Sequence, residues 1–172
     1  MTPAVLREAA RLKRVTRAGW LRIGVPSPES VADHSWGVAW LVLALLPPEL
    51  DRGRALSYAV LHDLAEVRVG DLTPYDGVSS DEKHAAEDTA MQGLLGARPD
   101  LHRLWRAYEA QADPEAQFVR QLDRLDMAVQ AAEYRDTHQV PVDEFFASAA
   151  AIITHPALRP LLDALRAPTR AS

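Results

Sequence analysis

The stretch RALSYAVLHDLAEV, residues 54–67, has the spacing of a helix and holds the clearest chemical signal in the chain. Apolar residues recur every three or four positions, which predicts one helix over the whole stretch. His62 and Asp63 interrupt this apolar pattern. A buried polar group without a partner costs about 1–3 kcal/mol, and a divalent metal ion would pair with both side chains. Glu66 shares their helix face, either as a general acid/base or as a second metal ligand.

Helices are predicted on both sides of this stretch, each with a local start or stop signal. Capping boxes at residues 30–33 and 79–82 begin two of them, and Asp113 followed by proline begins another. Glycine and proline mark loops over residues 15–28 and 68–78. No stretch alternates like a strand, so we predict an all-α fold of about seven or eight helices. The expected helices cover residues 3–13, 30–46, 54–67, 79–96, 99–111, 113–137, 142–154 and 157–166.

Composition narrows the possible classes of protein. The 172 residues are 48% apolar and 25% charged, which is typical of one soluble domain with its own core. Without cysteine there is no disulfide, thiolate nucleophile or iron–sulfur cluster, so a metal must be bound by His, Asp, Glu or backbone oxygen. The net charge of −5 argues against a broad nucleic-acid surface. The longest apolar run, residues 38–46, is shorter than the roughly 20 residues that span a membrane, and no signal peptide is visible, so we expect a cytoplasmic protein.

Three other polar sites are candidates for the same chemistry, and each has a structural alternative. His34 lies inside a capped helix and is either a ligand or a hydrogen-bonded core histidine. Asp123 lies on an apolar helix and is either a ligand or an exposed charge paired with Arg120 or Arg124. The loop at residues 70–74 either borders a site or forms an Asx-type turn.

The order His34, His62-Asp63 and Asp123 resembles the metal ligands of the HD-domain phosphohydrolases, an all-α superfamily. Further motifs are similar to the HD-domain 5′-deoxynucleotidase family and run in its order from Leu12 to Tyr134. They are LKRVTRAGW (12–20), PESVADH (28–34), HDLAE (62–66), GD (70–71), EKH (82–84) and FVRQLD (118–123). The resemblance implies a single HD domain over residues 1–172. Its metal motifs lie between residues 12 and 126, and the helices over 142–166 complete the core or form an interface.

The resemblance also implies roles for individual residues. The metal ligands are His34, His62, Asp63 and Asp123, the last preferred over Asp126. The catalytic residues are Glu66 as general acid/base, Arg17 as the group that orients the phosphate, and Asp71 near the sugar. The expected substrate-binding residues are Arg17, Trp20, Asp63, Asp71, Leu72, Thr73 and Pro74. Alternatively, Glu66, Asp71 and the carbonyl of Leu72 bind a second metal.

The implied reaction is metal-dependent hydrolysis of deoxyribonucleoside 5′-monophosphates to deoxyribonucleoside and phosphate. A divalent cation (Mn, Co, Mg, Zn, Ni or Fe) lowers the pKa of a bound water and offsets phosphoryl charge, and the guanidinium of Arg17 matches phosphate oxygens. Two alternatives stay open. The site could act on another nucleotide, such as a di- or triphosphate, a cyclic nucleotide or a ppGpp-like molecule. The protein could instead be a non-catalytic metal or nucleotide sensor.

The remaining predictions concern binding partners and the residues of the helix that begins at residue 79. The resemblance implies a nucleotide ligand and a homodimer, with no nucleic-acid or membrane partner. The apolar stretch at residues 145–153 forms the dimer surface or only covers the core. On the helix from residue 79, Lys83 is a candidate for contacting a phosphate, whereas His84 and Glu87 are expected at the surface.

Overall fold

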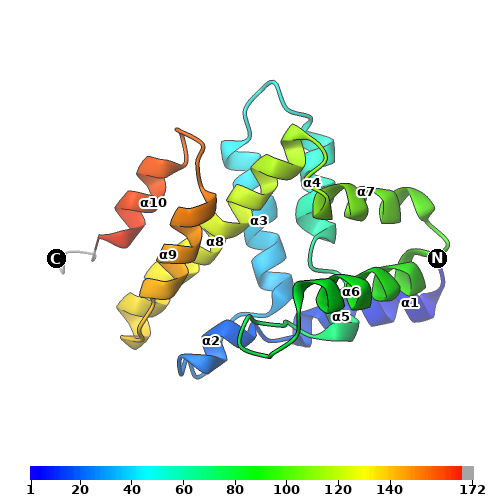
Figure 1. The fold of residues 1–172 in the computed structure, drawn as a ribbon, viewed down its shortest axis with the longest axis horizontal. Coiled ribbons are helices and arrows are strands. Elements are labelled where there is room, and N and C mark those ends of the chain that lie inside the picture. Colours follow the sequence, from blue (N-terminus) through cyan, green and yellow to red (C-terminus); the bar gives the residue numbers. More distant parts are fainter. Residues whose placement is uncertain (168–172) are drawn as a thin grey trace.

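The computed structural model describes residues 1–167 and shows an all-α fold (Figure 1). Within these residues there is no strand, and Thr16 and Ser30 form an isolated bridge. The prediction of an all-α fold is therefore confirmed. The helices are α1 (Pro3–Ala9), the 3-10 helix η1 (Ala10–Arg14), α2 (Ala18–Arg22), α3 (Val31–Leu45), α4 (Arg52–Leu61), α5 (Glu66–Val69), α6 (Ser80–Leu95), α7 (Pro99–Glu109), α8 (Pro114–His138), α9 (Asp143–Ile152) and α10 (Arg159–Arg166).

The helix starts follow the expected local chemistry. Both capping boxes form: Ser30 and Ser79 accept from the third helical residue, and the acidic residue there accepts from the backbone of the cap. Asp113 caps α8 by accepting from Ala116. The expected helix over 3–13 changes from α to 3-10 geometry at Ala10. The short helix α2 lies within the stretch expected to be a loop.

The prediction of one continuous helix over residues 54–67 is wrong. The helix α4 ends at Leu61, and α5 begins at Glu66. Between them the backbone makes tighter turns, in which the N–H of Glu66 donates to the carbonyl of Asp63 at 3.0 Å. The indole of Trp105 donates to the carbonyl of His62 at 3.2 Å. A tertiary hydrogen bond therefore satisfies a carbonyl at the point where the regular helix ends.

Two groups of buried side chains form the core, and the candidate site lies between them. Helices α3 and α8 run through the middle of the fold, with α9 and α10 on one side and α6 and α7 on the other (Figure 1). The larger group joins α2, α3, α4, α7, α8, α9 and α10. The smaller group joins the end of α4 to α6 and α7 around Trp105. His62 directly follows Leu61 of the smaller group, so the turn after α4 is held at the junction.

The C-terminal helices cover the core. Phe146, Ile153 and Leu162 are buried in the larger group, and Phe145 packs against it. Three large apolar side chains of α3, Trp36, Trp40 and Leu43, are exposed instead, at 71%, 55% and 54%. None of the described helices is long and apolar enough to span a membrane.

Candidate active site

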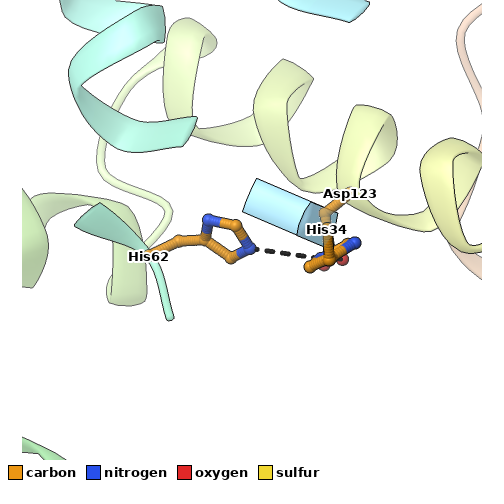
Figure 2. A group of neighbouring side chains, drawn as sticks. All are labelled: His34, His62 and Asp123. Carbon is orange, nitrogen blue, oxygen red and sulfur yellow. Dashed lines mark hydrogen bonds and ion pairs between the residues drawn. The ribbon is translucent and has the colours of Figure 1, made fainter. Parts of the chain in front are cut away.

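Three of the predicted metal ligands meet where α3, α4 and α8 approach one another. His34 lies on α3, His62 immediately follows α4, and Asp123 lies on α8. Their ligand atoms all lie within 4.8 Å of one another, and Figure 2 shows the His62 ring directed at the other two. The Nε2 atoms of the two histidines are 3.4 Å apart, and Asp123 Oδ1 lies 3.2 Å from Nε2 of His34.

Asp63, the fourth predicted ligand, lies against the same histidines. Its Oδ2 atom is 3.2 Å from Nε2 of His62 and 3.7 Å from Nε2 of His34. The same oxygen lies 3.6 Å from the guanidinium of Arg17. Asp63 therefore connects the histidine cluster to the residue that is predicted to orient the phosphate.

Hydrogen bonds hold both histidine rings with Nε2 facing the cluster. Nδ1 of His62 donates to the carbonyl of Ala59 at 2.9 Å, and Nδ1 of His34 lies 2.7 Å from Oδ2 of Asp126. Such partners fix the tautomer and the orientation of a ligating imidazole. In both rings the second nitrogen is thereby left for a metal ion.

Asp126 and Gly37 are functional candidates that our sequence analysis missed. Asp126 was considered only as a weaker choice of ligand, but it pairs with Nδ1 of His34, the ring nitrogen that faces away from the cluster. A Cβ atom at Gly37, on α3, would overlap the carboxylate of Asp126. The absence of a side chain at Gly37 therefore lets Asp126 reach His34. The spacing of Asp126, three residues after Asp123 on one helix, was the available signal.

We expect Gly37→Ala to lower the affinity for Mn²⁺ by about 10- to 100-fold, the usual effect of disturbing a partner of a ligating histidine. Calorimetric titration of the metal-free protein measures this. Gly53→Ala is the matched control, because a Cβ there meets only the side chain of Asp51 at 3.3 Å. Equal affinities in both variants would show that Asp126 does not need this space.

Charges within the cluster are strongly coupled. Burial alone would raise the pKa values of Asp63 and Asp123, but the neighbouring histidines and Arg17 or Arg124 lower both, so the carboxylates stay ionised. Burial lowers the pKa of His34, yet its hydrogen bonds to Asp123 and Asp126 outweigh this and raise it to about 9. In the metal-free protein the carboxylates of Asp123 and Asp126 therefore favour a protonated, cationic His34.

We expect metal affinity to rise with pH up to about 9, by up to about tenfold per unit, because His34 must release a proton to bind a metal. The stabilisation that protonated His34 gives the metal-free fold is complete below pH 6.5 and is lost as the pH rises through about 9. Titrations with Mn²⁺ at several pH values, each in two buffers of different ionisation enthalpy, measure affinity and proton release. An affinity independent of pH would contradict this assignment.

A cavity of about 730 Å³ borders the cluster, and every predicted substrate-binding residue lines it. Asp63 and Asp123 belong to both the cavity and the cluster. The predicted residues in its wall are Arg17, Trp20, Asp63, Glu66, Asp71, Leu72, Thr73, Pro74 and Asp123. Lys83, a candidate for contacting a phosphate, also lines it, and the residues that our sequence analysis did not assign to the substrate include Arg22, Tyr75, Arg124, Met127, Glu144 and Phe145.

Asp71 positions Arg17 in this wall. Its Oδ1 atom lies 3.4 Å from the guanidinium of Arg17, and its Oδ2 atom accepts from the backbone N–H of Ala18 at 2.7 Å. Burial would lower the pKa of Arg17, but Asp71, Asp63 and Glu66 raise it. The guanidinium therefore stays charged and is fixed between two carboxylates.

Glu66 is the most unusual carboxyl group of the cavity. It is 3% exposed, and its Oε2 atom is buried without a hydrogen-bond partner among the described residues. Burial, reinforced by the charges of Asp63 and Asp71, raises the pKa of Glu66 to about 10. A buried carboxyl oxygen that lacks a hydrogen-bond partner is typical of a group that exchanges a proton or contacts a cation. Both predicted roles of Glu66 remain compatible with this geometry.

Trp20 contributes mainly to packing. It is 1% exposed, stacks on Phe145 with ring centroids 4.1 Å apart, and donates its indole N–H to Glu29 at 2.9 Å. Trp20 lines the cavity together with Phe145. Its role beside the base or sugar stays a prediction.

The donor set fits a divalent transition metal. Two imidazole nitrogens and a carboxylate oxygen come together from three helices, and Asp63 adds a further oxygen beside them. Such mixed nitrogen and oxygen sites bind Mn, Fe, Co, Ni or Zn. Three or four protein ligands leave positions for water and substrate, as catalytic sites require.

Comparisons with known proteins agree with this geometry. The family model described as "HD domain" matches residues 9–161, a range that contains the whole cavity. The chain is 39% identical to 5′-deoxynucleotidase HDDC2 of Bos taurus, over 97% of this chain and 85% of that protein. It is 40% identical to the protein of the same name from Danio rerio, over 93% and 84%. Among solved structures, the PH0347 protein of Pyrococcus horikoshii OT3 has a TM-score of 0.81 and 35% identity, over 95% of this chain and 96% of that one.

Proposed function

The chain belongs to the HD-domain family, and from this premise we propose that it hydrolyses deoxyribonucleoside 5′-monophosphates to deoxyribonucleoside and phosphate. It is a metal-dependent phosphohydrolase. The observation that carries the proposal is that one cavity brings together the histidine–aspartate cluster, the fixed guanidinium of Arg17 and the orphaned carboxyl of Glu66. The names of the relatives that are 39% and 40% identical support the substrate class.

His34, His62, Asp63 and Asp123 would hold the metal. A divalent cation bound there would lower the pKa of a bound water molecule and offset negative charge on the phosphoryl group. Arg17 binds oxygens of the substrate phosphate, and its ion pairs with Asp63 and Asp71 keep it in one orientation. This fixed geometry lowers the entropy that is lost when phosphate and water are aligned.

Glu66 carries the proton between water and the leaving group. The oxygen of water forms a bond to phosphorus while the bond from phosphorus to the 5′ oxygen breaks. Glu66 starts protonated, gives its proton to the departing 5′ oxygen and takes the proton that water loses, so the carboxyl group ends as it began. Its buried position next to Asp63 and Asp71 favours this protonated starting form.

Selectivity for the deoxy sugar is assigned to the loop after α5. Asp71 and Thr73 line the cavity, and Asp76 accepts hydrogen bonds from both the backbone N–H and the hydroxyl of Thr73, at 2.6 and 2.8 Å. A tight fit of this loop around the 2′ position of the sugar would exclude a 2′-hydroxyl. The proposal therefore includes slower hydrolysis of ribonucleotides.

Phosphate release from a panel of deoxy and ribo 5′-mononucleotides tests the proposed function. The protein is treated with a chelator, and Mn, Co, Mg or Zn is then added back. We expect release from the deoxy substrates only after a metal is restored. Hydrolysis of AMP as fast as dAMP would contradict the sugar selectivity. If no mononucleotide is hydrolysed, polyphosphorylated or cyclic nucleotides become the candidate substrates.

We also propose that the protein forms a homodimer. The exposed side chains of Trp36, Trp40 and Leu43 share α3 and support this, because a large apolar surface on one helix is typical of an interface. Residues 145–153 are less suited, since Phe146 and Ile153 are buried within the chain. A monomeric mass in sedimentation at micromolar concentration would contradict the dimer. The cytoplasmic location stays a prediction.

A further inference from the structure

Lys83 places a second cation in the wall of the cavity. It lies on α6, four residues after the capping Ser79. Its Nζ atom donates to the carbonyl of Leu72 at 3.4 Å and lies 3.6 Å from Oε1 of Glu87. Lys83 and Leu72 line the cavity together with Arg17 and Glu66, so Lys83 borders the same space as the predicted phosphate-binding residue.

Glu87 holds the lysine in this position. We expected Glu87 at the surface, but it is only 9% exposed, so that prediction is wrong. Burial raises the pKa of Glu87, whereas Lys83 lowers it. Glu87 also belongs to a group with His84 and Glu109 whose ligand atoms lie within 4.8 Å of one another, but the ion pair already gives its carboxylate a cationic partner.

The ammonium group of Lys83 stays charged and has an N–H donor left for a ligand. Burial lowers the pKa of Lys83, but Glu87, Glu66, Asp63 and Asp71 outweigh this and raise it. An ammonium group has three N–H donors, and the contacts with Leu72 and Glu87 use two of them. The third is available to a ligand in the cavity.

The charge of the substrate favours a second cationic side chain. Arg17 is already paired with Asp63 and Asp71, which offset much of its charge. A phosphate monoester carries about two negative charges near neutral pH. A second cation on the cavity wall would offset charge that Arg17 leaves uncompensated.

We propose that the ammonium of Lys83 donates a hydrogen bond to a non-bridging oxygen of the substrate phosphate, alongside Arg17. This inference rests on the proposed function and makes Lys83 a substrate-binding residue. Glu87 is then a positioning residue that acts through Lys83. The carbonyl of Leu72 completes the site by accepting a hydrogen bond from the same ammonium group.

The sequence provides a matched control for the test. Of the 19 basic residues, only Lys13 and Lys83 are lysines, and Lys13 is exposed outside the cavity. The variants are Lys83→Met, which removes the charge, Lys83→Gln as a second neutral replacement, Lys83→Arg, and Lys13→Met. Each is loaded with the same metal, and its metal content is measured to confirm that the ligands are intact.

For Lys83→Met and Lys83→Gln, we expect the KM for a deoxyribonucleoside 5′-monophosphate and the inhibition constant of inorganic phosphate to rise about 10- to 100-fold. This is the usual effect of losing a hydrogen bond to a charged group. The inhibition constant of the uncharged deoxyribonucleoside should change less than about twofold, because it lacks the phosphate. Lys83→Arg should restore part of the loss, and Lys13→Met should match the wild type. A purely structural role would weaken nucleoside and phosphate binding equally.

Phosphate binding without turnover separates this proposal from the proposed function. Inorganic phosphate should raise the Tm of the metal-loaded wild type and raise that of the neutral Lys83 variants much less. Equal shifts would overturn the role of Lys83. If the wild type releases no phosphate from any deoxynucleotide, the proposed function fails, yet the same Tm comparison still decides whether Lys83 binds phosphate.

Discussion

Replacing His62 with alanine should lower kcat for phosphate release by about 1000-fold or more and remove bound metal. The substitution deletes an imidazole whose Nδ1 is held by Ala59 and whose Nε2 faces both His34 and Asp63. Losing the several kcal/mol that a metal contributes to the transition state accounts for the size of the effect. Metal content by mass spectrometry and kcat with saturating Mn²⁺ measure the two consequences.

A matched control separates loss of the metal from loss of folding. His102 is as buried as His62, at 7% against 6%, but it pairs with Asp88 and lies outside the cluster of His34, His62 and Asp123. His102→Ala should therefore lower the Tm while metal content and kcat stay close to the wild type. If His62→Ala retains both metal and activity, the cluster is not the catalytic metal site.

Glu66→Gln should lower kcat by about 100- to 10,000-fold, the contribution typical of a positioned general acid or base. The amide keeps the size of the side chain but exchanges no proton. The carboxyl that it replaces is buried, its Oε2 atom has no hydrogen-bond partner in the described part of the chain, and its pKa is raised to about 10. The substitution should also remove the part of the pH dependence of kcat that reports the titration of Glu66. Steady-state kinetics at several pH values measure this.

Metal stoichiometry distinguishes the two predicted roles of Glu66. If it is an acid/base, Glu66→Gln retains the same number of bound ions as the wild type. A loss of one ion from two would instead assign Glu66 to a second metal, together with Asp71 and the carbonyl of Leu72. Glu109→Gln is the control, because burial also raises the pKa of Glu109 although it does not line the cavity. Wild-type kcat in Glu66→Gln would exclude both roles.

Local sequence patterns predicted the elements that depend on neighbouring residues. The capping boxes at Ser30 and Ser79 and the cap at Asp113 form as expected, because each needs hydrogen bonds only three residues away. The same reasoning was wrong after Leu61. There the periodicity continues, but Trp105, more than 40 residues along the chain, binds the carbonyl of His62 and the helix ends.

The sequence by itself determined the all-α class, the family resemblance and the identity of the residues that meet at the site. Motif spacing was enough for these, since helix signals are local and the ligand types are set by their chemistry. Only the tertiary structure decided how these residues are held. The bond between His34 and Asp126 spans 92 positions, and its dependence on Gly37 lies across two helices. The burial of Glu66 and the attachment of Lys83 to Leu72 and Glu87 likewise come from packing between helices, which periodicity along one chain segment does not encode.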